Sequence, residues 1–138
     1  MVKQDYGEAR ETWVEMQDAA HVVMQGTLAE AQVFKQILTL RAARYLWHFL
    51  TRALFPSQGR DLTALGNTAV LHMPDDPTLT THVGVVDLPD EEYAILGTMS
   101  KGDAWEIKIS RNEAHRLWGI LDLLLYPVGW EGREQNEL

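Results

Sequence analysis

Basic side chains gather in one short stretch, RAARYLWHFLTR at residues 41–52, and their spacing points to anion binding. The stretch carries Arg41, Arg44 and Arg52, with His48 between them. On a helical wheel these four side chains fall within an arc of about 80°, while apolar residues occupy the opposite side. Guanidinium groups pair with carboxylates and phosphates. The pattern therefore predicts a cationic face on a helix, with Tyr45 beside it.

Three interpretations of this cationic face compete. In the first, which is favoured, the face is solvated or pairs with acid of the same chain, because residues 61–100 hold seven Asp and Glu and no Lys or Arg. Such surface ion pairs contribute only about 0–1 kcal/mol each. The second is contact with another copy of the chain or an acidic protein, since Arg, Tyr and Trp are enriched in interfaces. The third, binding of nucleic acid or another polyanion, is disfavoured by a net charge of -8.

Two histidines, His72 and His82, are weak candidates for metal ligands. They fall in consecutive predicted strands, but a metal site needs three or four converging ligands. We therefore expect no metal and no other cofactor. The chain also contains no cysteine and no glycine-rich phosphate-binding motif. The acidic residues cluster in turns beside prolines, where solvation is the simpler interpretation, so no catalytic residues are predicted.

The elements that position the cationic face are predicted to be helical. Residues 8–25 have apolar side chains at spacings of three and four, which is typical of a helix. Gly26 interrupts this pattern, and Thr27 with Glu30 forms a capping-box signature for a second helix over 28–55. One continuous helix over 8–55 is the alternative. A helix over 28–55 is about 40 Å long and would overhang a domain about 37 Å wide, which favours self-association.

Four strands and a last helix are predicted in the rest of the chain. The strands cover 68–73, 82–88, 93–99 and 104–110, and the turn SKGD at 100–103 joins the last two. Ser110 and Glu113 form a second capping-box signature, which opens a helix that Pro127 ends. Residues 56–67 are rich in turn formers and are predicted to be a loop.

The expected fold is α+β, a two-layer sandwich in which an antiparallel meander of about four strands packs against two N-terminal helices and one C-terminal helix. Residues 1–127 form the single domain and 128–138 a flexible tail. With no apolar run of about 20 residues and no signal-peptide pattern, we expect a cytoplasmic protein without membrane contact. The expected function is non-enzymatic, through protein contacts in a homodimer or larger homo-oligomer. The alternative is binding of a small ligand or polyanion by the cationic face, and an enzyme is third.

Overall fold

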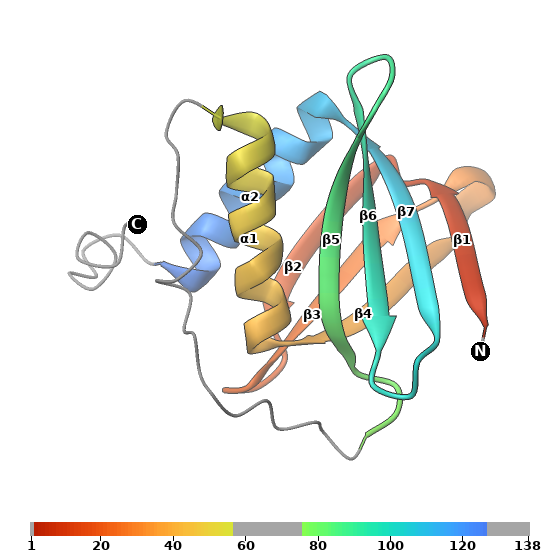
Figure 1. Cartoon of the computed structure of the whole chain (residues 1–138), viewed down its shortest axis with the longest axis vertical. Coiled ribbons are helices and arrows are strands. Elements are labelled where there is room, and N and C mark those ends of the chain that lie inside the picture. The colour runs from red at the N-terminus through yellow and green to blue at the C-terminus, as the bar shows by residue number, and fades with distance from the viewer. Residues whose placement is uncertain (1, 57–75, 127–138) are drawn as a thin grey trace.

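The computed structural model describes residues 2–56 and 76–126 and contains seven strands and two α-helices in this part of the chain (Figure 1). In chain order the elements are β1 (Lys3–Glu8), β2 (Glu11–Met16), β3 (His21–Thr27), the short 3-10 turn η1 (Ala29–Ala31), β4 (Val33–Thr39), α1 (Leu40–Leu54), β5 (Thr80–Leu88), β6 (Glu92–Met99), β7 (Ala104–Ser110) and α2 (Arg111–Leu125).

One mixed sheet contains all seven strands, in the order β1-β7-β6-β5-β4-β3-β2. The pairs β1–β7 and β4–β5 are parallel, and the other neighbours are antiparallel. The β4–β5 pairing consists of a single register pair, Leu38 with Thr80. In Figure 1 the strands β5, β6, β7 and β1 lie in front, β2–β4 cross behind them, and both helices lie together at one side. The sheet is therefore two half-sheets that meet at one point.

Large aromatic side chains fill the space between the two half-sheets. The Phe34 ring on β4 lies 6.3 Å from the Trp105 ring on β7 and 5.5 Å from the Tyr6 ring on β1. Gly97 on β6 makes room for Trp105, because a Cβ atom there would collide with the indole ring. The indole N–H donates to the Thr80 hydroxyl at 2.8 Å. The core is thus built by residues from both half-sheets.

Tryptophan side chains fasten the two helices to each other. Trp118 on α2 donates its indole N–H to the Thr51 hydroxyl on α1 at 2.8 Å, and Trp47 on α1 donates to Asp122 on α2 at 3.1 Å. The start of α1 is capped by Thr39, whose hydroxyl accepts the Ala42 N–H at 3.1 Å. The helix pair is therefore held by buried polar contacts as well as by its apolar faces.

A buried carboxylate attaches α2 to the edge strand β2. Glu113 accepts the Thr12 backbone N–H at 2.6 Å and the Thr12 hydroxyl at 2.7 Å, and it pairs with Arg116 at 2.8 Å. Arg116 also donates to the Thr12 carbonyl oxygen. Burial by itself would raise the pKa of Glu113, but the hydrogen bonds from Arg116 and Thr12 outweigh it and lower the pKa below its ordinary value. Two side chains of α2 thus form the backbone hydrogen bonds at Thr12 that a further strand would form at this edge of the sheet.

The N-terminal half of the predicted fold is wrong. Residues 8–25 form no helix, because β2 and most of β3 lie there, and Gly26 and Thr27 belong to β3 instead of a helix boundary. Of the helix predicted over 28–55, residues 33–39 are β4 and only Leu40–Leu54 is α-helical, with the short 3-10 turn η1 before β4. With 15 residues, α1 is about 22 Å long. It does not overhang the domain, so this argument for self-association no longer holds.

The C-terminal half agrees with prediction for the described residues. The structure confirms the strands at 82–88, 93–99 and 104–110, the turn between the last two with Gly102 at φ 100, and the helix after Ser110. The Ser110 hydroxyl accepts the Glu113 N–H at 3.1 Å. The predicted strand at 68–73 and the tail at 128–138 lie outside the described residues. The class α+β is confirmed, whereas a four-stranded meander with three helices is not the observed arrangement.

Candidate functional site

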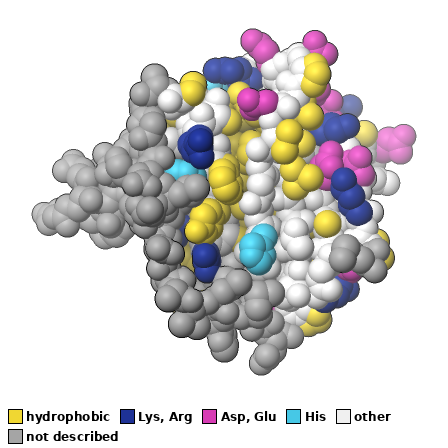
Figure 2. Space-filling model, in the orientation of Figure 1, with side chains coloured by type: hydrophobic (Ala, Val, Ile, Leu, Met, Phe, Trp, Pro, Cys, Tyr) yellow, Lys and Arg dark blue, Asp and Glu magenta, His cyan; other side chains and the backbone are white. Residues whose placement is uncertain are grey.

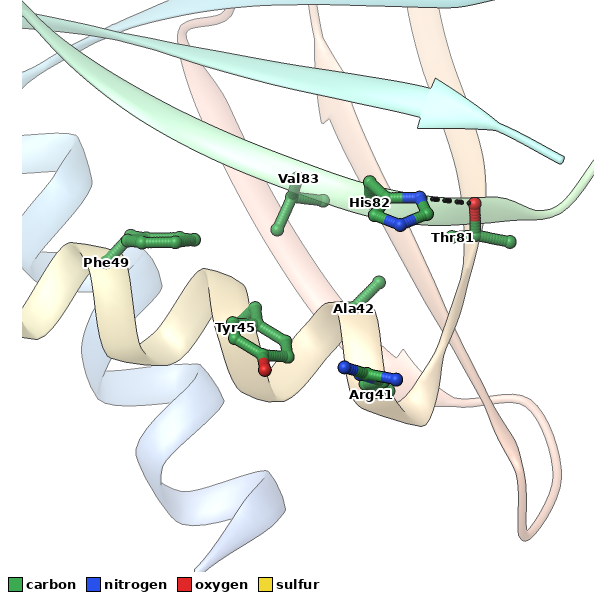
Figure 3. A pocket seen from close by; sticks show the side chains of 7 residues that line it. All are labelled: Arg41, Ala42, Tyr45, Phe49, Thr81, His82 and Val83. Atoms are coloured by element: carbon green, nitrogen blue, oxygen red, sulfur yellow. Dashed lines mark hydrogen bonds between the residues drawn. The ribbon is translucent and has the colours of Figure 1, made fainter. Parts of the chain in front are cut away.

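The best candidate site is a groove between α1 and β5 (Figure 3). It encloses about 270 Å³ and is lined by Arg41, Ala42, Tyr45, Phe49, Thr81, His82 and Val83. We call it the α1–β5 groove. Its position follows from the sheet, because β4 stops pairing with β5 after Leu38 and Thr80, and α1 continues the chain alongside β5.

The α1 wall of the groove combines one guanidinium with two aromatic rings. The Arg41 guanidinium carbon lies 5.4 Å from the centre of the Tyr45 ring, a cation–π distance. The Tyr45 and Phe49 rings lie 6.0 Å apart, one helical turn from each other. All three side chains are half-buried. Arg41 also belongs to the first turn of α1, where the helix dipole favours negative charge.

The β5 wall carries a histidine held in place by its neighbour. The Thr81 hydroxyl lies 2.9 Å from His82 Nδ1 and donates to the Thr98 carbonyl at 3.4 Å. These contacts hold the orientation of the imidazole ring. Figure 3 shows the second ring nitrogen of His82 turned toward α1, and the apolar Val83 beside it. The groove therefore offers fixed polar groups on both walls.

Of the predicted cationic face, only Arg41 lines the groove, with Tyr45 next to it. Arg44 and Arg52 are exposed outside it, and among the described residues no acidic group forms an ion pair with any of these three arginines. His48 is fully buried, with its ring edge-on to Phe49 at 5.7 Å. In Figure 2 hydrophobic, basic and histidine side chains lie together over this region, while most acidic side chains lie elsewhere on the same face.

The two histidines named as weak candidates for metal ligands are not tested as a pair by the described residues. His72 lies outside them, and His82 is an exposed part of the groove wall. Within residues 2–56 and 76–126, no three potential ligand side chains gather into a metal site. His82 therefore belongs to the groove, a role for which the sequence carried no signal.

Phe49, Thr81 and Val83 were missed by sequence reasoning. Residues 41–49 and 81–83 are far apart in the chain, and only the packing of α1 beside β5 joins them. Phe49 lies one turn after Tyr45 on the same helix, so the helical wheel could have added it to the face. The β5 residues had no such marker.

A second cavity of about 320 Å³ lies between the β1–β2 connection and η1. Its lining mixes Glu8 and Glu30 with Arg10, all of them exposed. This mixture of charges defines no ligand chemistry. The α1–β5 groove is the better candidate because the charge of its described lining residues has one sign and its walls are mostly apolar.

In the part of the chain that the structure describes, no helix is long and apolar enough to cross a membrane. Comparison with known proteins found no family model, no curated protein and no solved structure that matches this chain.

Proposed function

We propose that the protein binds a small molecule with an apolar body and an anionic group in the α1–β5 groove. The observation that carries the proposal is the composition of the groove. It places one arginine beside two aromatic rings and a valine, and no carboxylate of the described chain lines it. Ligand sites are typically concave, mostly apolar and equipped with a few fixed polar groups.

The alternatives have weaker support. A polyanion would need several cations along its path, but Arg44 and Arg52 lie outside the groove lining. Self-association was argued mainly from a long helix, and α1 has only 15 residues. A small anion needs only the groups that the groove brings together.

Binding of anilinonaphthalene sulfonate, a fluorescent aromatic anion, tests the proposal. We expect saturable binding of one dye per chain, and loss of most of it in Val83→Phe, whose larger side chain would fill the groove. Val86→Phe is the matched control, because Val86 is an exposed valine of the same strand and does not line the groove.

Circular dichroism of each variant shows whether the fold is retained, since the dye also binds partly unfolded chains. If folded Val83→Phe and Val86→Phe bind the dye as well as the parent chain, the groove is not the site. If the parent chain binds no dye and no other small aromatic anion, the proposal is wrong.

A further inference from the structure

We infer that the occupant of the α1–β5 groove is a monocarboxylic acid whose apolar body contains a single ring or a short branched chain. The inference rests on the proposed function and names the class of ligand. It is drawn from the arrangement of Arg41, from the charges near it, and from the shape of the apolar walls.

Arg41 is arranged to receive a planar group with two oxygens. Its guanidinium carbon lies 5.4 Å from the centre of the Tyr45 ring, a cation–π contact that restrains the side chain. The edge of the guanidinium, with its N–H groups in a fixed fork, remains for a ligand. A carboxylate matches this fork with two parallel hydrogen bonds. Since the side chain is already half-buried and in contact with the Tyr45 ring, little conformational freedom is lost on binding.

The charges favour a single negative charge on the ligand. Among the described residues that line the groove, Arg41 is the one permanently charged side chain. The chain as a whole carries -8, so each extra negative charge on a ligand meets more repulsion. A carboxylate carries one charge at neutral pH, whereas a phosphate monoester carries between one and two.

The apolar walls limit the size and shape of the body. Tyr45 and Phe49 present two rings from one side, and Val83 faces them from β5. A cavity of about 270 Å³ lies at or below the low end of the range for ligand pockets, about 300 Å³. It suits one ring or a short branched chain, and it is too small for a long acyl chain.

A series of four probes tests the class of ligand on the full chain. Binding of each probe is measured by chemical-shift titration of the ¹⁵N-labelled protein. Phenylacetate is the expected type of ligand. Phenylacetamide has the same shape without the charge, acetate has the charge without the ring, and phenyl phosphate carries more charge. We expect phenylacetate to bind at least tenfold more tightly than each of the others.

Two arginine variants test whether Arg41 binds the carboxylate of the ligand. Arg41→Gln should weaken phenylacetate binding about tenfold or more and leave phenylacetamide binding unchanged, because only the charged ligand uses the guanidinium. Arg44→Gln is the matched control, since it removes one exposed arginine of the same helix that does not line the groove.

Each contrary result overturns a different statement. Equal binding of phenylacetate and phenylacetamide, or an unchanged affinity in Arg41→Gln, excludes a carboxylate held by Arg41. Tighter binding of phenyl phosphate replaces the carboxylate with a phosphate ester. Each of these three results still leaves the groove as a ligand site. If no probe shifts the groove resonances and the dye experiment also fails, the proposed function itself is excluded.

Discussion

Glu113 is a buried carboxylate that joins α2 to the edge strand β2, which lies about 100 residues earlier in the chain. It accepts two hydrogen bonds from Thr12 and pairs with Arg116, while only 9% of it is exposed. Replacing the carboxylate by an amide removes the charge from three contacts at once. We expect Glu113→Gln to lower the free energy of unfolding by about 1–3 kcal/mol, measured by urea denaturation. Glu15→Gln, an exposed change on the same edge strand, should alter it by less than about 0.5 kcal/mol.

The lowered pKa of Glu113 sets the pH range of this contribution. Because the folded protein holds the pKa below its ordinary value of about 4.3, the stabilisation is complete above that pH. It is lost as the pH falls through the pKa of the folded state. The stability difference between the parent chain and Glu113→Gln should therefore shrink as the pH falls from about 4.3 through the lower pKa of the folded state. If this stability difference stays constant as the pH falls, Glu113 does not stabilise the fold through its negative charge.

Single residues also show where the sequence was informative about the site. Arg41 was singled out by helical spacing and Tyr45 as an aromatic residue beside it, and both line the candidate groove. His48 has the same spacing as the arginines, yet it is fully buried. A helical wheel assigns side chains to a face of the helix, but it cannot tell which part of that face other segments cover.

Among the elements, β6 and β7 depend on a glycine that admits a large ring. A Cβ atom at Gly97 would collide with the Trp105 indole, whereas one at Gly84 on β5 would meet nothing within 4 Å. We expect Gly97→Ala to destabilise the protein by about 1–3 kcal/mol through overpacking. Gly84→Ala should change the stability by less than about 0.5 kcal/mol. Thermal unfolding of the two variants gives the comparison, and equal midpoints would show that Trp105 has room to move.

The N-terminal strands were hidden from sequence analysis by polar residues on their buried faces. Thr12 and Gln36 are buried together with Val14 and Leu38, and Gly26 shares the buried face of β3. A strand signal needs apolar side chains at every second position, and these residues interrupt it. The remaining apolar spacings of three and four then resembled a helix.

The C-terminal elements were predicted because their boundaries carry clear local chemistry. The turn at 100–103 contains Gly102 in a left-handed conformation, and Ser110 caps α2 with its hydroxyl. Buried Trp105 and Ile107 alternate with half-buried Glu106 and Lys108, so the strand period is visible. No local signal, however, could bring α1 beside β5, because that contact joins distant parts of the chain.

At the scale of the whole molecule, basic and acidic side chains are exposed in separate places, and this separation still predicts self-association. Arg44 and Arg52 are exposed on α1, and Asp87, Asp90 and Glu91 are exposed near the β5–β6 turn. If the exposed acidic residues of one copy pair with the exposed arginines of another, the measured molecular mass should exceed 15.7 kDa at low salt. It should fall toward 15.7 kDa as added salt screens the charges. Light scattering at about 0.02 M and 0.5 M NaCl tests this. A constant 15.7 kDa at both salt concentrations would exclude the prediction.

The single register pair between β4 and β5 has a consequence for hydrogen exchange. Amides of β3 and β6 are bonded to strands on both sides, whereas β4 and β5 share only Leu38 and Thr80 across their common boundary. The two half-sheets can therefore separate locally at this boundary without breaking either ladder. Amides of β4 and β5 that face this boundary should exchange faster with deuterium than those of β3 and β6. The molecule would then open along the line where α1 and β5 form the groove, and a bound ligand should slow that exchange.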